Sequence, residues 1–448
     1  MNRASLQILS VALVTGAGLL SAPAPASAAV PSTLTLRAPD RGHIFTTVPV
    51  TATLADPAGQ PLQDRQVRLQ RWVDGGWSAG RRVTTNANGV ARAEMRIRAD
   101  DRNNKFRATW AGDSDPDGYA GATSDPEPVN GVRVDTRLRL SGPDSVIDER
   151  RTTLWIRWVA RDGRNVHQRV RLLRRNAGRR TWRHVRSPLV DHGRARVRVR
   201  PRVDTRWKVV GAANAWHTRA RSTVHRVDNL PPSRPVVLPR NAPRPDIRLR
   251  PQRRASGGGL NPQVTRIPGT VWRHMTGRSW HRGCPVGRPS LRLVRMNYWG
   301  FDGYRHRGEM VVHRRVARPT VGVFRDLYQM KTPIRSMYRV DRFGWSRRLH
   351  GANDYRSMAA DNTSAFNCRN VVGRPGVRSP HSYGDAIDLD PWENPYVSRQ
   401  GTYPNRWWLS RSHKRVAWRS RSHPVVRAFR RHGFAWGGSF SDFHHFED

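Results

Sequence analysis

The stretch Val67-Arg68-Leu69-Gln70-Arg71-Trp72 alternates apolar with polar or basic side chains, and a similar stretch, Val170-Arg171-Leu172-Leu173-Arg174, follows about 104 residues later. Such alternation is typical of a β-strand with one buried face. Gly89-Val90-Ala91-Arg92-Ala93 and Gly193-Arg194-Ala195-Arg196-Val197 repeat at nearly the same distance. We therefore predict two tandem all-β sandwich domains, over residues 31–134 and 135–228.

A period of this length is the usual size of an immunoglobulin-like sandwich. The two predicted domains resemble the immunoglobulin-like modules of bacterial surface proteins, although no sharp motif marks them. One predicted strand presents Arg194, Arg196, Arg198 and Arg200 on a single face. A solvated strand face explains this pattern, and a basic surface that holds the protein to an anionic cell wall is the functional alternative.

The charge and the N-terminus restrict the possible partners. The net charge is +46, which predicts attraction to polyanions such as nucleic acid, anionic lipid or the teichoic acids of a cell wall. Arg3 precedes an apolar run over residues 8–20, and Ala26-Ser27-Ala28 follows as a small-residue cleavage site. This is typical of a secretory signal peptide over residues 1–28. We therefore expect a secreted protein, extracellular or associated with the cell wall, that is monomeric, has no membrane span and does not bind nucleic acid.

Residues 229–262 have the composition of a linker. Eight Pro fall in this range, and Ser256-Gly257-Gly258-Gly259 closes it. Pro-rich chain is semi-rigid and Gly-rich chain is flexible, so the segment is predicted to be a spacer without a fold of its own.

Residues 263–448 have the pattern of an α+β domain. Strands are predicted over 291–298 and 309–313, and helices over 315–327 and 425–431. Cys284 and Cys368 are the only cysteines. In an exported protein such a pair is most simply a disulfide, although two cysteine ligands of a zinc ion are the alternative.

Two short motifs in this domain carry metal chemistry. The first is Ser379-Pro380-His381-Ser382-Tyr383-Gly384-Asp385-Ala386-Ile387-Asp388, and the second is Asp442-Phe443-His444-His445-Phe446-Glu447. Together they offer two histidines and a carboxylate to one ion, and a further carboxylate as a base. Three protein ligands with an open fourth position are typical of hydrolytic zinc sites.

These motifs resemble those of the VanY-like D-alanyl-D-alanine carboxypeptidase family of zinc peptidases, which includes L-alanyl-D-glutamate endopeptidases. Residues 308–312, 332–334 and 361–369 resemble further landmarks of that family. The resemblance implies an α+β zinc peptidase domain over 263–448, with Zn²⁺ held by His381, Asp388 and His445. Asp442 would be the general base that accepts a proton from water and delivers it to the leaving amine. A second register, with His444 as ligand and Glu447 as base, stays open.

The resemblance also implies an arginine that stabilises the transition state. Arg369 is the first candidate and Arg356 the second. Ser364, Tyr383 and Asp361 are candidates for the substrate cleft, with capping or packing as the alternative for each. Asp385 and Asp390 are interpreted as solvated or capping residues, and Trp436 as packing under the site.

The leading hypothesis is a secreted zinc peptidase that cleaves peptidoglycan stem peptides, either by releasing a terminal D-Ala or by cutting an internal bond such as L-Ala–D-Glu. Anionic cell-wall polymers are the second expected partner. The competing hypothesis is a non-catalytic, cationic wall-binding protein that retains a peptidase scaffold. A nucleic-acid-binding protein is a third possibility, which only the charge favours.

Overall fold

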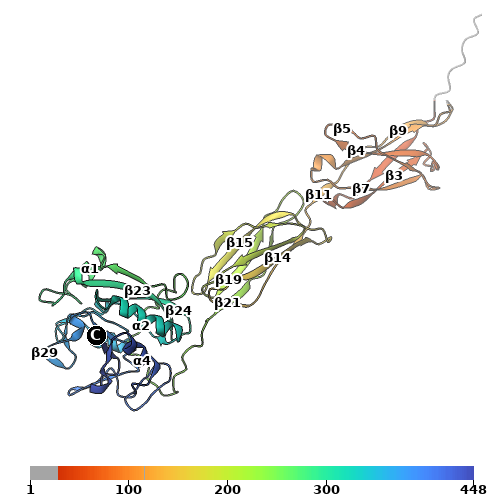
Figure 1. Ribbon diagram of the computed structural model, residues 1–448. Helices are drawn as coiled ribbons and strands as arrows, with labels where there is room; N and C mark the ends of the chain where they lie inside the picture. The colour runs from red at the N-terminus through yellow and green to blue at the C-terminus, as the bar shows by residue number, and fades with distance from the viewer. Residues whose placement is uncertain (1–28, 116) are drawn as a thin grey trace, which may run out of the picture.

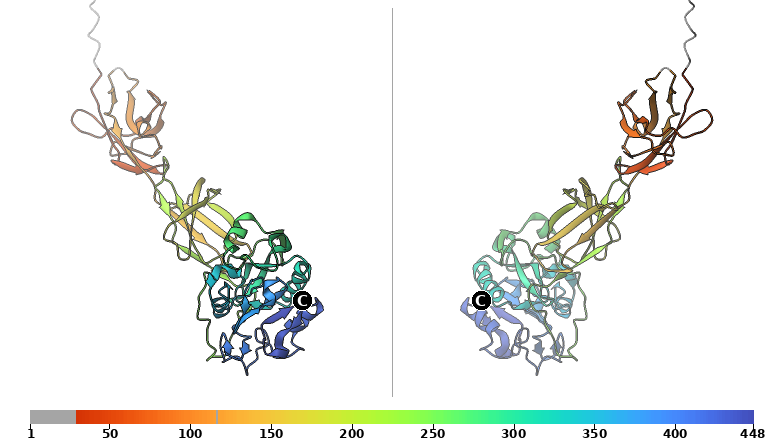
Figure 2. Two further views of the ribbon diagram at one scale, coloured as in Figure 1. Left: turned by 90° about the vertical axis from the view of Figure 1, so that its left-hand side faces the viewer. Right: turned by 90° about the vertical axis from the view of Figure 1, so that its right-hand side faces the viewer.

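The structure is a computed structural model and describes residues 29–115 and 117–448. Two β-sandwiches and a C-terminal α+β domain follow one another in a row (Figure 1). The views at right angles show the same linear order (Figure 2). The predicted signal peptide lies outside the described residues. Within these residues, no helix is long and apolar enough to cross a membrane.

The first sandwich packs a three-stranded sheet against a larger one. The three-stranded sheet has the order β1 (Thr33–Arg37), β3 (Thr47–Ala55) and β7 (Val90–Arg96), all antiparallel. Inward side chains alternate with exposed ones along each strand and form one apolar core between the sheets. The strands of the larger sheet are β4 (Gln66–Val73), β5 (Gly76–Trp77), β6 (Arg81–Thr84), β8 (Lys105–Gly112), β9 (Ala120–Thr123) and β10 (Glu127–Pro128). A parallel pair, β2 (Arg41–His43) and β11 (Asn130–Val132), closes one end.

The second sandwich repeats this arrangement. Its three-stranded sheet is β12 (Thr136–Ser141), β14 (Thr152–Ala160) and β18 (Arg194–Val199). The strands of the opposite sheet are β13 (Ser145–Ile147), β15 (Gln168–Asn176), β16 (Arg183–Arg186), β17 (Leu189–Val190), β19 (Thr205–Gly211), β20 (Ala220–Arg221) and β21 (His225–Leu230). Trp158 and Trp207 fill its core. These are the two sandwiches that the sequence repeat predicts.

Specific contacts join the three domains. Trp216 packs against the cores of both sandwiches, and its ring lies 6.1 Å from that of Phe45 in the first. At the other end, Glu149 forms two contacts with Arg305 of the C-terminal domain, of 2.6 and 3.1 Å. The side chain of Arg305 is only 6 % exposed. Because this pair is bidentate and largely shielded from water, it holds the second sandwich to the C-terminal domain more firmly than an exposed pair would.

The C-terminal domain has one main sheet and a smaller one. In the main sheet, β22 (Gln263–Arg266), β23 (Leu291–Gly300) and β24 (Arg305–His313) are antiparallel, and β25 (Pro333–Ile334) pairs with β23. The helices are α1 (Gly269–Met275), α2 (Ala317–Gln329), α3 (Asp354–Ala359) and α4 (Pro424–Arg431). Strands β23 and β24 and helices α2 and α4 confirm the four elements predicted from periodicity. Helix α2 lies against β23, and α4 packs on α2 (Figure 1).

The smaller sheet has the order β30 (Ala386–Asp388), β34 (His445–Glu447) and β33 (Ala435–Trp436). Its apolar side packs into the main core, where the ring of Phe446 stacks on Phe429 at 3.7 Å. Three short strand pairs complete the domain: β26 (Trp345–Ser346) with β27 (Gly351–Ala352), β28 (Asn370–Val371) with β29 (Arg374–Arg378), and β31 (Tyr396–Ser398) with β32 (Gly401–Tyr403).

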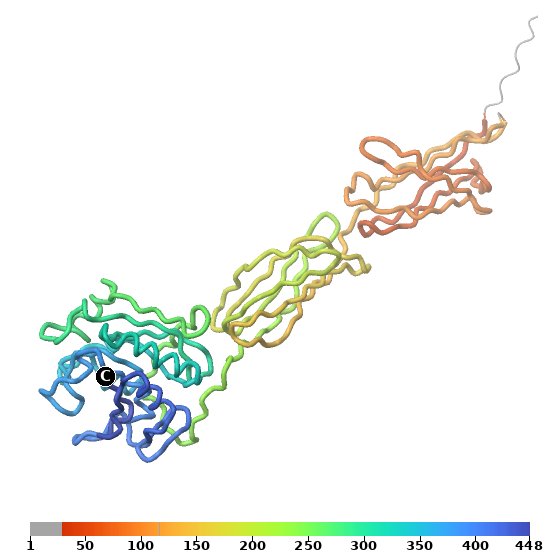
Figure 3. Tube along the Cα trace, in the orientation of Figure 1, coloured from red at the N-terminus to blue at the C-terminus, as the bar shows by residue number. Residues whose placement is uncertain are grey.

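After β21 ends at Leu230, the segment predicted as a spacer has no helix or regular strand, but it contacts the C-terminal domain. Ile247 and Leu249 pack against the buried Val340 and Phe343. The indole N–H of Trp392 donates to the carbonyl of Pro243 at 2.9 Å. The segment therefore runs along the surface of the C-terminal domain before it enters β22 (Figure 3). The composition of this segment predicts a spacer without a fold of its own, and the structure adds that its apolar side chains contact the C-terminal domain.

Candidate metal centre

Two of the predicted ligands lie opposite one another on neighbouring strands. Asp388 of β30 pairs directly with His445 of β34 in the antiparallel ladder. Directly opposed side chains in such a ladder have Cβ atoms about 4.5–5.5 Å apart. Between the ligands and the core, Ile387 and Phe446 are fully buried and anchor both strands. Two ligands are thus placed by the strand register alone.

The third predicted ligand comes from a short turn. His381 lies in the 3-10 turn Pro380–Ser382, which begins with the Ser379 hydroxyl accepting from the His381 N–H. Gly384 then reverses the chain with φ of 80°. A Cβ atom there would lie 2.8 Å from the backbone nitrogen of His313, so only glycine fits. This turn brings His381 over β30.

The three side chains converge on one point. His381 Nε2 lies 3.1 Å from Asp388 Oδ2 and 3.2 Å from His445 Nδ1, and His445 Nδ1 lies 3.1 Å from Asp388 Oδ1. All three residues are buried, and their ligating atoms lie within 4.8 Å of one another. In a tetrahedral zinc site with bonds of about 2.0–2.2 Å, neighbouring ligand atoms are roughly 3.3–3.6 Å apart. The observed triangle is only slightly tighter.

Hydrogen bonds determine which imidazole nitrogens face the centre. His381 Nδ1 donates to the carbonyl of Ala365 at 2.7 Å, and His445 Nε2 donates to the Glu447 carboxylate at 3.1 Å. The remaining nitrogens, His381 Nε2 and His445 Nδ1, therefore point their lone pairs toward the Asp388 carboxylate. Three acceptors facing one another are stable only around a cation. Metal-binding histidines commonly donate their other N–H to a carbonyl or carboxylate in this way. The donor set therefore fits a zinc ion.

The electrostatics of the site also favour a positive charge. Burial lowers the pKa of His445, but its hydrogen bonds to Asp388 and Glu447 outweigh this and raise the pKa to about 10. Burial raises the pKa of Asp388, but the nearby His381 and His444 hold it well below its usual range. The site thus keeps one carboxylate ionised and attracts a cation, either a proton or a metal ion.

A cavity of about 200 Å³ opens beside the three side chains, and Asp442 lines it. Asp442 directly follows Ser441, which turns the chain with a φ of 62°. Asp442 Oδ1 is buried and has no hydrogen-bond partner, although His444 Nε2 lies 3.3 Å away. Burial raises the pKa of Asp442, and the neighbouring histidines oppose this only in part. An unpartnered, poorly solvated carboxylate is well suited to accept a proton.

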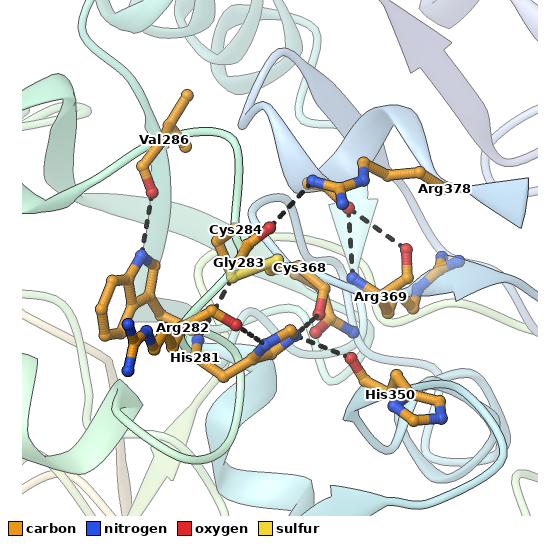
Figure 4. The surroundings of a disulfide bond; sticks show 12 residues. His281, Arg282, Gly283, Cys284, Val286, His350, Cys368, Arg369 and Arg378 are labelled. Atoms are coloured by element: carbon orange, nitrogen blue, oxygen red, sulfur yellow. Dashed lines mark hydrogen bonds between the residues drawn. A yellow bond between two sulfur atoms is a disulfide. The ribbon is translucent and has the colours of Figure 1, made fainter. Parts of the chain in front are cut away.

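Arg369 lines the same cavity. Its Nη2 lies 2.6 Å from the buried Asp354 Oδ2, which holds the guanidinium in place. Arg369 directly follows Cys368, which is bonded to Cys284 as predicted, with Cα atoms 5.9 Å apart. Figure 4 shows this bridge, with Arg378 donating to the carbonyl of Gly283 beside it. Arg356, the other candidate, is exposed on α3 and does not line the cavity.

The second register uses groups that have other contacts. His444 Nδ1 donates to the carbonyl of Asn394 at 2.7 Å, and its Nε2 lies 3.8 Å from Asp388 Oδ1. Glu447, the base of that register, accepts from His445 instead. The geometry thus favours His445 as ligand and Asp442 as base. The alternative of a Cys zinc site does not hold, because both sulfurs are in the disulfide.

Several predicted residues lie away from the cavity. Ser364 is buried and pairs with Asp388 through the backbone, with N–O distances of 2.9 and 3.0 Å. Tyr383 is 45 % exposed, just past the turn that carries His381. Neither is among the residues that line the cavity, so the structure does not support their assignment to substrate binding. Asp361 is buried and ion-paired with Arg335 at 2.6 Å.

The remaining residues singled out in the sequence have structural contacts. Asp385 forms an ion pair with Arg315 at 2.6 Å, and Asp390 Oδ1 accepts from the Arg335 backbone N–H at 3.0 Å. Trp436 packs against the main core and donates to the carbonyl of Phe443 at 3.0 Å. This is the packing role predicted for Trp436.

Three residues of the site had not been predicted in their observed roles. Asp354 holds Arg369, Glu447 orients His445, and Tyr396 forms part of the cavity wall. The Glu447 position, two residues after the ligand on the same strand face, is a signal that strand periodicity could have provided.

Comparison with known proteins supports a peptidase at this end of the chain. Residues 372–448 match the family model described as D-alanyl-D-alanine carboxypeptidase. This range includes the three converging side chains and Asp442. The match supports a C-terminal peptidase domain. No curated protein matches the chain.

Solved structures add little. The chain is similar to trypsin-activated alpha-2-macroglobulin from Escherichia coli at 12 % identity, over 45 % of this chain and 16 % of that chain, with a TM-score of 0.18. It is similar to a Ca²⁺-stabilized adhesin from an Antarctic bacterium at 13 % identity, over 64 % of each chain, with a TM-score of 0.21. At these scores neither likeness carries an argument about this protein.

Proposed function

We propose that the C-terminal domain is a zinc-dependent peptidase that hydrolyses peptide bonds in peptidoglycan stem peptides, and that the protein acts outside the cell, at the wall. The observation that carries the proposal is the convergence of His381 Nε2, Asp388 and His445 Nδ1, with each imidazole N–H already committed to another acceptor. The family match over residues 372–448 supports a peptidase of the D-alanyl-D-alanine carboxypeptidase type.

Each polar group of the cavity has a role in this reaction. His381, Asp388 and His445 would hold the ion. Bound zinc supplies a Lewis acid that makes water a better nucleophile and polarises the scissile carbonyl. Asp442 accepts the proton of the attacking water and delivers it to the leaving amine. Burial raises the pKa of Asp442, which makes its carboxylate a stronger base than that of an exposed aspartate and favours uptake of the proton from water.

Arg369 supplies the fixed positive charge. Its salt bridge with Asp354 and its position after the Cys284–Cys368 bridge hold the guanidinium at the cavity wall. A pre-oriented cation stabilises the oxygen that becomes negative in the transition state without any reorganisation. Arg374, which is exposed and lines the same cavity, adds a second positive charge near the entrance.

The substrate class agrees with the rest of the chain. The net charge of +46 attracts the protein to anionic wall polymers, and a predicted signal peptide would place it outside the cell. Both release of a terminal D-Ala and cleavage of an internal bond such as L-Ala–D-Glu belong to this class of reaction.

The proposal is tested by incubating the full-length protein with purified peptidoglycan, with and without a chelator, and identifying the products by mass spectrometry. We expect free D-Ala or shortened stem peptides, and none after chelation until zinc is restored. Absence of any product from the zinc-loaded protein would favour the non-catalytic wall-binding hypothesis.

A pair of variants separates the base from the ligands. Asp442→Asn should lower the cleavage rate by about 10²–10⁴-fold because the proton acceptor is lost. It should still bind one zinc ion per chain, as determined by metal analysis. Asp385→Asn, which removes a carboxylate outside the cavity, is the matched control and should cleave normally. Loss of zinc from Asp442→Asn would show that Asp442 is a ligand instead.

A further inference from the structure

One face of the second sandwich carries six arginines. Apart from Ser141, the exposed side chains on the outer surface of the β12–β14–β18 sheet are Arg137, Arg139, Trp155, Arg157, Arg194, Arg196 and Arg198. We call these seven residues the arginine face. Arg139, Arg157 and Arg194 are directly opposed across the three strands and form a row. The exposed faces of β-strands are not usually so uniform in charge.

The positive charges of the arginine face are not neutralised by neighbouring side chains of the described residues. Within the described residues, none of its six guanidinium groups has a salt bridge or a side-chain hydrogen bond. Like charges directly opposite one another in a sheet are destabilising. On the other sheet of the same domain, by contrast, Arg169 donates to the carbonyl of Ser187 at 2.9 Å, and Lys208 lies 4.3 Å above the ring of Trp182. The unpaired arginines are therefore free to meet an external anion.

The surface over these strands is also concave. A groove of about 1240 Å³ runs over β12 and β14 and is bounded on one side by Arg219 and Arg221, near β20. Asp135 is the single acidic side chain among the described residues that line it. Trp155 lies in the groove and is 49 % exposed. An exposed indole among arginines offers an apolar surface to a ring, beside donors for anionic groups.

The first sandwich provides an internal control. Its β1–β3–β7 sheet has the same order and the same register as β12–β14–β18. At the positions of Arg139, Trp155, Arg157, Arg194 and Arg198 it carries Thr35, Thr51, Thr53, Val90 and Glu94. These are ordinary residues for an exposed strand. Of the six arginines, only Arg196 has an arginine counterpart in the first sandwich, Arg92, so the fold does not need the other five.

We propose that the arginine face is a binding site for a phosphodiester-linked glycopolymer. Along β18, alternate residues place Arg194, Arg196 and Arg198 about 7 Å apart, so successive charges of an extended chain are met in turn. Guanidinium groups bind phosphate oxygens in bidentate fashion, and Trp155 packs on a sugar or polyol unit between them. The site rests on the geometry of the second sandwich. Its assignment to a polymer of the cell wall rests on the proposed function.

The test exchanges the arginine face for its counterpart. The exchange variant of the full-length protein carries Arg139→Thr, Trp155→Thr, Arg157→Thr, Arg194→Val and Arg198→Glu. The control variant loses the same charge elsewhere in the same domain, by Arg171→Thr, Arg179→Thr, Arg183→Thr, Arg186→Thr and Arg206→Thr. Binding is measured by co-sedimentation with isolated cell walls, before and after hydrofluoric acid removes their phosphodiester polymers.

We expect the exchange variant to lose at least tenfold in affinity for untreated walls, and the control variant less than threefold. Each lost phosphate contact should lower the slope of log affinity against log salt by about 0.7. The proposal would be overturned if the two variants lost equal affinity for untreated walls. It would also be overturned if the wild-type protein bound acid-treated walls as tightly as untreated ones. If the wild-type protein bound duplex DNA or polyglutamate more tightly than the phosphodiester polymer extracted from walls, the assignment of the ligand to this polymer class would be wrong.

Two further measurements keep the result independent of folding and of catalysis. Trp155→Thr alone should weaken binding to untreated walls by several-fold, and it keeps the test decisive if the fivefold exchange fails to fold. All variants should cleave a small soluble stem peptide at the wild-type rate, because the cavity is in another domain. An exchange variant that still cleaves but no longer binds supports the site, whatever bond the peptidase domain cuts.

Discussion

The proposed metal centre and the arginine face differ in how their charged groups are arranged. At the metal centre, His381, Asp388 and His445 are buried, and each polar atom is committed to a specific partner. On the arginine face, the charges are exposed and of one sign, and they have no partner among the described residues. A buried site depends on the placement of each atom, whereas an exposed one depends on the number and spacing of its charges. The first should fail on a single substitution, and the second should weaken by steps.

The largest expected effect is on the free energy of unfolding when a buried charge loses its ion-pair partner. Asp354→Ala leaves Arg369 buried without its ion pair, which should destabilise the C-terminal domain by about 3–5 kcal/mol. Asp228→Ala removes the partner of Arg226 in an exposed pair and should leave the stability of the second sandwich nearly unchanged. Denaturant unfolding followed by tryptophan fluorescence measures both. Similar losses of stability in the two variants would contradict the expected difference between buried and exposed charges.

An intermediate effect is expected from the carboxylate that orients a ligand. Glu447→Gln weakens the acceptor of the His445 Nε2–H and should lower zinc affinity by about 10–100-fold. Competition with a chromophoric chelator measures this without any assay of activity. Asp448→Asn, one residue further along, is the control and should leave the affinity unchanged. Unaltered affinity in Glu447→Gln would mean that His445 is oriented by packing alone.

The smallest effect has the opposite sign. Arg157 lies between Arg139 and Arg194, so Arg157→Thr should stabilise the second sandwich by about 0.2–1 kcal/mol while it weakens binding to walls. Slower hydrogen exchange at the amides of β14 and β18 would show the gain. Thr53→Arg, at the same position of the first sandwich, should have little effect because Thr35 and Val90 are its neighbours. Faster exchange in Arg157→Thr would contradict an electrostatic strain within the row.

Much of the architecture could be predicted because it follows from local patterns. Alternation over residues such as 67–72 and its return at 170–174 predict both sandwiches, since a strand with one buried face must alternate. The proposed ligands lie in two compact motifs, and their convergence follows from one turn and one strand pair. The family match over residues 372–448 agrees with the resemblance found in these motifs.

Other features depend on distant contacts and could not be predicted. Tyr383 lies between two of the proposed ligands in sequence, and Ser364 pairs with Asp388 through the backbone, but neither is among the residues that line the cavity. The role of Glu447 depends on which imidazole nitrogen of His445 faces inward. The composition of residues 229–262 predicts a stiff chain, yet it cannot show that Ile247 and Leu249 would find an apolar surface on another domain.

The packed linker limits how the second sandwich can move relative to the C-terminal domain. Because the linker lies along the C-terminal domain and Glu149 pairs with Arg305 at the boundary, we expect the second sandwich to keep a nearly constant position relative to the cavity of the C-terminal domain. A polymer held on one domain would thus stand at a constant offset from the bond cut by the other. If the C-terminal domain cleaves wall peptides as proposed, its cuts should fall at a set distance from the point where the polymer is bound.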